Sequence, residues 1–316
     1  MCVTMWQHRK WFALSIMFTF VVFLTALRTV KSNVLHKVDV LRRSTTGFST
    51  GHRYAFLTQA HSNGPATESV VANIRRWHRA ERIFVFTDAC GLESTAINFT
   101  NMCTKYACQW LHDGKSGGHG QKDQIPESGY IYMRRIFRVL HMCDCEYLVV
   151  IEDDTCVHMA LTKQFDPDAH GDLGGLPWDP FSPEFVKMAA EHSGVDESRV
   201  AAAVTGCSTG CYYRTSFFLE KEEKFTRGLV LKAASFAPVH FADVIGPAFV
   251  VMMGGNVTPW HAVSERSLGA DVAGILTDVP VAKLRPFEHS KNCLFDDSAR
   301  TASDKVFPTC TIDSRR

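Results

Sequence analysis

The segment Tyr147-Leu148-Val149-Val150-Ile151-Glu152-Asp153-Asp154 joins the most apolar strand candidate of the chain to three consecutive acids. A short, continuous apolar run is typical of a strand that is buried on both faces of a parallel sheet. In such sheets ligands bind beside the carboxyl ends of the strands, which is where the three acids fall. The segment therefore predicts a central strand over 147–151 with a ligand site at its end.

Strand and helix patterns alternate on the amino-terminal side of this segment. Tyr54–Leu57 is a short apolar run that stops at Thr58-Gln59, and residues 67–77 carry apolar side chains at helical spacing. A second apolar run follows over Arg82–Phe86. Strand, helix and strand at this spacing indicate parallel strands of one sheet, and we expect an α/β fold.

A helix is expected immediately before the acidic segment, ending near Cys143. Its apolar residues fall on one helical face and its arginines toward the other; the apolar set is Tyr130, Met133, Ile136, Phe137 and Leu140. The glycine-rich stretch 114–129 is predicted to be a surface loop. Its Gly-Lys-Ser lacks the first glycine of a phosphate-binding loop, so no such loop is expected.

The amino-terminal region has the pattern of a membrane anchor. Residues 11–27 carry no charge and lie between basic residues, and the run is near the lower length limit for a membrane-spanning helix. A cleaved signal peptide is the alternative, although its apolar core is usually shorter. We predict a cytoplasmic tail over 1–10, a transmembrane signal-anchor over 11–27, a stem over 28–51 and a lumenal catalytic domain over 52–316.

Cysteines and glycosylation sequons favour a single-pass type II protein of the Golgi or endoplasmic reticulum membrane. Ten of the 11 cysteines follow the apolar run, an even number that a disulfide-bonded lumenal domain would carry. Two N-x-S/T sequons, at Asn98 and Asn256, agree with lumenal exposure.

Two other classes of partner are disfavoured. The formal net charge is +1 and no long Lys/Arg stripe occurs, which argues against nucleic acid. The closely spaced pairs Cys143/Cys145 and Cys207/Cys211 lack the C-x-x-C spacing of a structural zinc site.

The three acids Glu152-Asp153-Asp154 are suited to holding a divalent cation. Carboxylates at one strand end repel one another, and a hard ion with oxygen ligands, Mg²⁺ or Mn²⁺, offsets this repulsion. Such an ion could bridge the two phosphates of a nucleoside diphosphate sugar and neutralise the leaving diphosphate. The alternative is an acidic turn or a helix N-cap with no ligand.

Here the sequence resembles a known family. Met133-Arg134, then Cys143, then the block Glu146–His158 (EYLVVIEDDTCVH) are similar to the helix, cysteine, strand and acidic motif of the β1,3-glycosyltransferases, the galactosyltransferase and Fringe-like family with a GT-A fold. The segment Ala242–Gly246 is similar to the E-D-V-x-x-G segment of that family. Glu152 stands where the family has its first Asp.

The resemblance implies a mixed, mainly parallel, Rossmann-type sheet flanked by helices and a hexosyltransferase that uses a UDP-sugar. It implies that Asp154 is the main metal ligand, that His289 completes the metal site, and that Asp153 and Glu152 assist through water or the ribose. A glycan, glycoprotein or glycolipid would be the acceptor.

Three further residues receive roles. The resemblance implies that Asp243 is the base of an inverting transfer, because a carboxylate must accept the proton of the acceptor hydroxyl. A helix N-cap is the other interpretation of Asp243. Thr58 and Asp88 follow the first two strand cores and are placed to hold the nucleoside, although strand-end caps would look the same.

Two alternatives to a transferase remain open. One is a lumenal metal-dependent hydrolase, for which the second acidic group would be Asp166, Asp168, His170 and Asp172. The other is a non-catalytic, sugar-binding protein with a transferase-like fold, for which Ala242, in place of an acid, is the best argument.

Overall fold

The computed structural model describes residues 52–60, 64–87, 99–113, 126–153, 155–157, 159–177, 180–207, 210–236, 241–265 and 287–289. The predicted tail, anchor and stem lie outside these residues. No helix within the described ranges is long and apolar enough to cross a membrane.

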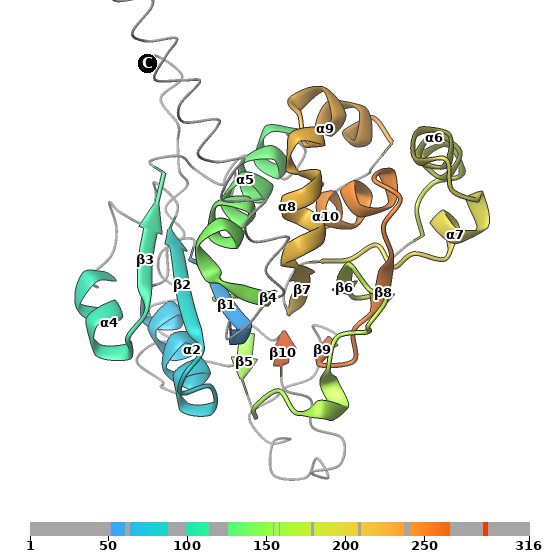
Figure 1. The fold of residues 1–316 in the computed structure, drawn as a ribbon. Helices are drawn as coiled ribbons and strands as arrows, with labels where there is room; N and C mark the ends of the chain where they lie inside the picture. The colour runs from blue at the N-terminus through green and yellow to red at the C-terminus, as the bar shows by residue number, and fades with distance from the viewer. Residues whose placement is uncertain are drawn as a thin grey trace, which may run out of the picture. The chain divides into compact units, whose positions relative to one another are not determined.

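A seven-stranded sheet forms the centre of the described structure, with strand order β3-β2-β1-β4-β7-β6-β8 (Figure 1). Its members are β1 (His52–Ala60), β2 (Arg82–Thr87), β3 (Gln109–His112), β4 (Cys145–Glu152), β6 (Leu173–Gly175), β7 (Cys211–Arg214) and β8 (Val257–Pro259). The pairs along β3-β2-β1-β4 and the pair β6-β8 are parallel, whereas β7 is antiparallel to β4 and β6. The prediction of a mixed, mainly parallel sheet is confirmed.

Two predicted boundaries are corrected. Strand β1 continues through Thr58 and Gln59 to Ala60, because β2 and β4 pair with it on both sides as far as those residues. The predicted loop 114–129 is shorter, since helix α5 begins at Pro126. Proline is favoured at the first position of a helix, where no N–H bond is needed, and Glu127 adds an acid to the first turn.

Helices cover both faces of the sheet (Figure 1). On one face lie α2 (Gly64–Trp77) and α4 (Phe99–Tyr106), and their apolar residues form one hydrophobic cluster with the sheet. The other face is covered by α5 (Pro126–Cys143), α8 (Thr215–Lys221), α9 (Arg227–Ala234) and α10 (Phe241–Met252), with α6 (Pro183–Ser193) and α7 (Glu197–Ala201) in the same cluster. We call these the α2/α4 face and the α5/α10 face.

Alternation along the central strands assigns each side chain to one face. Ala55 and Leu57 of β1 belong to the cluster of the α5/α10 face, as do Leu148 and Val150 of β4. Their neighbours, among them Phe56, belong to the cluster of the α2/α4 face. Because successive side chains of a strand point to opposite faces, this period extends to the strand ends.

A three-stranded sheet begins directly after the acidic motif. It has the order β5-β10-β9, formed by β5 (Thr155–Val157), β9 (Val263–Glu265) and β10 (Phe287–His289). Strand β10 is antiparallel to β5 and parallel to β9. A distant part of the chain is therefore brought beside the residues that follow Asp153.

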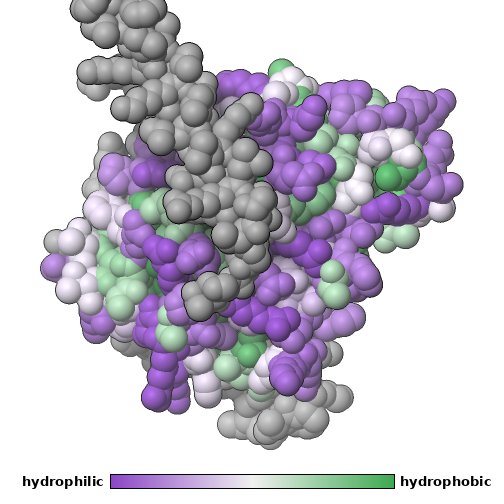
Figure 2. Space-filling model, viewed as in Figure 1, coloured by the Kyte–Doolittle hydropathy of each residue, from purple (hydrophilic) through white to green (hydrophobic). Residues whose placement is uncertain are grey.

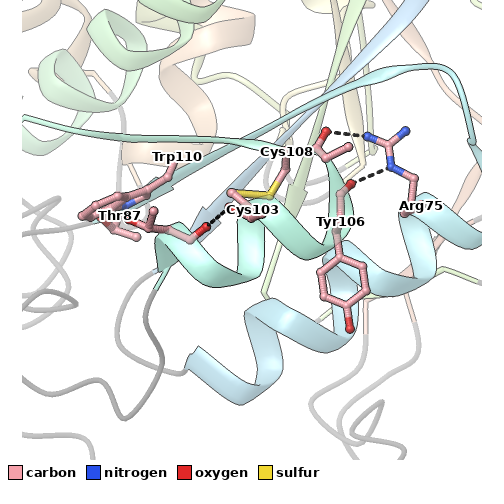
Figure 3. The surroundings of a disulfide bond; sticks show 9 residues. Arg75, Thr87, Cys103, Tyr106, Cys108 and Trp110 are labelled. Atoms are coloured by element: carbon pink, nitrogen blue, oxygen red, sulfur yellow. Dashed lines mark hydrogen bonds between the residues drawn. A yellow bond between two sulfur atoms is a disulfide. The ribbon is translucent and has the colours of Figure 1, made fainter.

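Two disulfides lie within the described residues, Cys103–Cys108 and Cys143–Cys145. Figure 3 shows the first of them, which closes the end of α4, and the guanidinium of Arg75 of α2 beside it. Arg75 donates from Nε to the carbonyl of Tyr106 at 2.8 Å and from Nη2 to that of Ala107 at 2.9 Å. The disulfide and the arginine together fix the turn between α4 and β3.

Hydrophilic residues cover most of the face shown in Figure 2, and apolar residues appear there in small, separate areas. Among the described residues, Trp77 and Leu231 are the large apolar side chains that remain exposed, at 39% and 59%. Apolar side chains are thus concentrated in the two clusters that flank the sheet.

Candidate active site at the carboxyl ends of the central strands

The acidic motif lies at the carboxyl end of β4, as predicted. Val150 and Ile151 are fully buried, and the next two residues, Glu152 and Asp153, are partly exposed. Glu152 is the last residue of the strand and Asp153 begins the turn after it. The strand therefore delivers two carboxylates to the edge of the sheet; Asp154 lies outside the described residues.

Asp243 lies in the first turn of α10, on the α5/α10 face, and its side chain is half-buried. It is therefore a residue within the helix, not the N-cap that the sequence offered as an alternative.

Glu152 and Asp243 lie near the same buried groups. Burial raises the pKa of the Tyr132 phenol well above its ordinary value, and the nearby ionisable groups of Cys207, Cys211, Asp243 and Glu152 raise it further. The chain segment that carries both cysteines contacts both elements: the backbone N–H of Cys207 donates to the carbonyl of Asp243 at 2.9 Å, and Cys211 pairs with Val150, two residues before Glu152. The fold therefore brings together two of the predicted site residues.

The Cys211 thiol has the same surroundings. Its pKa is raised well above the ordinary value by burial, by the neighbouring Cys207 thiol and by the charges of Asp243 and Glu152. Cys207 Sγ also lies 3.1 Å from Tyr213 Oη, and we call the buried side chains of Cys207, Cys211 and Tyr213 the buried polar layer. A thiol of raised pKa stays protonated at neutral pH and is neither a good nucleophile nor a metal ligand.

A backbone hydrogen bond joins this layer to α10. Pro247, inside α10, has no N–H, so the carbonyl of Asp243 lacks the donor that an α-helix normally supplies four residues later. The backbone N–H of Cys207 donates to that carbonyl instead, at 2.9 Å. The position of Asp243 is thereby tied to the chain segment that leads into β7.

Gln59 is a site residue that the sequence analysis missed. It pairs in register with Glu152 of β4, and alternation places both side chains on the α5/α10 face. Gln59 is only 3% exposed, and within the described residues its Nε2 has no hydrogen-bond partner. The period-two alternation that begins at Ala55 and Leu57 was the signal that could have found it.

Tyr132 was also missed. Its hydroxyl is buried and has no hydrogen-bond partner among the described residues, although it lies near Glu152 and Asp243. The sequence placed it beside the apolar face of its helix and gave no signal of a polar role. Only the packing of α5 on the sheet brings it to the carboxylates.

Thr58 is fully buried, and its Oγ1 likewise has no hydrogen-bond partner within the described ranges. It pairs with Ile151 and lies on the α2/α4 face, whereas Glu152 lies on the other face. The structure therefore separates Thr58 from Glu152 by the thickness of the sheet. Asp88, the second predicted nucleoside ligand, lies outside the described residues.

Of the two predicted metal ligands, Asp154 lies outside the described residues, and His289 is described in its backbone. His289 of β10 pairs in register with Thr155, the residue after Asp154, although the His289 side chain is outside the described set. Glu152 and Asp153 supply hard oxygen donors at the same strand end, which suit Mg²⁺ or Mn²⁺. The described residues contain no group of three His, Cys, Asp or Glu side chains that could hold a metal by itself.

The second acidic group considered for a hydrolase forms structural contacts. Tyr54 Oη donates to Asp166 at 2.6 Å, Asp168 accepts from the backbone of His170 at 2.7 Å, and Asp172 accepts from the backbone of Asn256 at 2.9 Å. These bonds stabilise the turn before β6 and its contact with β8. The turn therefore has a structural account that needs no second metal site.

Two polar side chains near the same turn, those of Arg214 and Trp260, also form structural contacts. Arg214 Nη2 donates to the carbonyls of Asp168 and Ala169, at 3.1 and 2.6 Å. Trp260 is 4% exposed, and its Nε1 donates to the carbonyl of Phe165 at 2.9 Å.

No protein-family model and no curated protein matches the sequence. Among solved structures, the chain is similar to the galactosyltransferase LgtC in complex with donor and acceptor sugar analogues: 13% identity, TM-score 0.46, covering 79% of this chain and 94% of LgtC. It is also similar to the glycosyltransferase GlyE of Streptococcus pneumoniae TIGR4: 12% identity, TM-score 0.44, covering 76% of this chain and 54% of GlyE. These structural neighbours are GT-A-type glycosyltransferases; none of them identifies the Fringe-like family.

Proposed function

We propose that this chain is a metal-dependent glycosyltransferase. It transfers a hexose or N-acetylhexosamine from a UDP-sugar to a hydroxyl of a glycan, glycoprotein or glycolipid. The observation that carries the proposal is that Glu152, at the end of β4, and Asp243 of α10 both lie beside the buried polar layer: Cys207 bonds to the Asp243 carbonyl, and Cys211 pairs with Val150 of β4. Carboxylates from two elements at the carboxyl edge of parallel strands are suited to a bound, reacting ligand.

The metal would be Mn²⁺ or Mg²⁺, held by Asp154 and His289 with help from Asp153 and Glu152. When bound, it would neutralise charge on the diphosphate leaving group. Support comes from the register of His289 with Thr155 and from the oxygen donors at the strand end.

Asp243 would act as the general base. Its carboxylate accepts the proton of the acceptor hydroxyl, the freed oxygen forms a bond to the anomeric carbon of the sugar, and the bond from that carbon to the diphosphate oxygen breaks. Attack from the side opposite the leaving group inverts the anomeric configuration. The backbone bond from Cys207 to the Asp243 carbonyl supports this role, because it holds the base in place during proton transfer.

Thr58 and Asp88 would hold the nucleoside. The buried, unmatched Oγ1 of Thr58 is consistent with a ligand that supplies its partner. We further propose that residues 11–27 anchor the enzyme in the Golgi or endoplasmic reticulum membrane with its catalytic domain in the lumen.

The test is UDP release from UDP-glucose, UDP-galactose, UDP-N-acetylglucosamine and UDP-N-acetylgalactosamine, with and without Mn²⁺, in the presence of glycan acceptors. A transferase releases UDP together with a lengthened acceptor. A hydrolase of other substrates releases no UDP, and a sugar-binding protein binds without turnover; either result would refute the proposal.

A further inference from the structure

Two hydrogen-bond donors are buried beside the acidic motif without an acceptor. They are Gln59 Nε2 and Tyr132 Oη, and neither has a partner within the part of the chain that the structure describes. A buried donor without an acceptor destabilises the folded state, so folded proteins rarely keep one without a reason. A ligand that supplies the acceptor is one such reason.

Both donors belong to the same part of the molecule. Gln59 stands in register with Glu152, and the alternation of β1 and β4 places both side chains on the α5/α10 face. Tyr132 approaches from α5, and its side chain packs against the hydrophobic cluster of that face, where Glu152 and Asp243 contribute to raising its pKa. Two donors and two carboxylates thus come from four different elements to one strand end.

The chemistry of these two donors and two carboxylates indicates which chemical group of a ligand they would bind. The Tyr132 phenol keeps its proton, because burial and the nearby negative charges raise its pKa, and it therefore acts as a donor. An alcohol hydroxyl can accept from such a donor and donate its own proton to a carboxylate at the same time. A phosphate oxygen has no proton to donate at neutral pH and would be repelled by Glu152 and Asp243.

We propose that Gln59 and Tyr132 bind hydroxyl groups of the transferred sugar and determine which sugar is accepted. The inference rests on the proposed function and deepens it, because it assigns the sugar subsite to the α5/α10 face. A site that hydrogen-bonds a substrate hydroxyl rejects an analogue that lacks it or places it differently.

The experiment uses the full chain and two nearly isosteric variants, Tyr132→Phe and Gln59→Met. Calorimetry measures the affinity for UDP and for the four UDP-sugars named above, and thermal unfolding gives the melting temperature. Tyr130→Phe is the matched control: Tyr130 lies on the same helix, stacked on Phe225 with Arg227 over its ring.

We expect Tyr132→Phe to weaken binding of the preferred UDP-sugar about tenfold, which corresponds to one hydrogen bond in a charged setting. The affinity for UDP should stay within about twofold, because the phenol is proposed to contact the sugar and not the nucleotide. The melting temperature should not fall, since the variant removes a hydroxyl that has no hydrogen-bond partner among the residues that the structure describes. Gln59→Met should behave alike and alter the order of preference among the four sugars.

Other outcomes would overturn the inference. Equal losses for UDP and UDP-sugars, or a Tyr132→Phe variant that binds every UDP-sugar as the wild type does, would refute a sugar-contacting role. A clear loss of melting temperature in Tyr132→Phe would show a structural bond instead. A wild-type chain that releases no UDP from any donor refutes the proposed function, whereas release by the wild type and both variants alike refutes only this inference.

Discussion

At the carboxyl ends of the central strands, the two faces of the sheet carry different kinds of side chain. On the α2/α4 face the last side chains of β1 and β2 include Thr58 and Thr87, and Trp110 Nε1 donates to Thr87 Oγ1 at 3.0 Å. On the α5/α10 face the corresponding positions of β1 and β4 carry Gln59 and Glu152. Small neutral hydroxyls close one face, and amide and carboxylate groups stand on the other, so the chemistry is expected on the α5/α10 face.

The largest expected effect concerns the acid that follows this edge. Asp154→Ala should abolish metal-dependent binding of the donor, because the main carboxylate ligand of the cation is lost. Affinity for UDP measured with and without Mn²⁺ checks this. If Mn²⁺ strengthened UDP binding of the variant as much as that of the wild type, the metal site would not lie at this strand end.

Asp243→Asn should lower kcat by about 100-fold or more and leave donor binding intact, which is the scale of general-base catalysis. Steady-state kinetics and UDP calorimetry separate the two effects. Asp144→Asn is the control: Asp144 is an exposed acid with a positive φ of 47°, a conformation that asparagine tolerates. Nearly normal turnover in Asp243→Asn would place the base elsewhere.

A substitution against the α2/α4 face should change the stability of the fold and leave kcat unchanged. A Cβ at Gly174 would come within 1.9 Å of the Tyr212 ring, which belongs to the cluster of that face. Gly174→Ala should therefore destabilise the fold by about 1–3 kcal/mol, the usual cost of overpacking. Denaturant unfolding measures the change, and kcat of the folded fraction should match the wild type.

The smallest expected effect tests most directly whether the two faces bind different parts of the donor. Thr58→Val should weaken UDP and UDP-sugar binding by the same factor, about 5-fold for one neutral hydrogen bond, because Thr58 is proposed to contact the nucleoside. Gln59→Met is expected to weaken only the sugar complexes. If calorimetry showed the reverse pattern, the assignment of nucleoside and sugar to opposite faces would be wrong.

The parts of the fold that local sequence predicted are those with strong patterns. The run 147–151 lies within β4, and Arg82–Phe86 lies within β2, because a continuous apolar run needs no partner to be recognised. The predicted end of β1 was wrong. The last residues of this strand are polar, and they are held in it by pairing with β2 and β4, which are distant in sequence. The first turn of α5 was also assigned to a loop, although Pro126 is a favourable first residue.

The candidate site could be predicted only where a motif marked it. Glu152 and Asp243 come from two motifs, and the fold brings them to the same buried groups. Gln59 could have been found by alternation, but Tyr132 could not, because its position depends on how α5 packs against the sheet. The roles of Asp88, Asp154 and the His289 side chain stay predictions, since these groups lie outside the described residues.

Pro247 affects how a mutagenesis library for the candidate active site should be designed. Because Pro247 has no N–H, the carbonyl of Asp243 accepts from the backbone N–H of Cys207 instead. This hydrogen bond joins two main-chain atoms, so substituting the polar side chains around the carboxylates would not remove it. Any residue with an amide proton at position 247 would offer the helix its own donor and compete with the incoming loop. A library that randomises only polar positions would therefore overlook the proline ring, one helical turn away, that influences the position of the proposed base, Asp243.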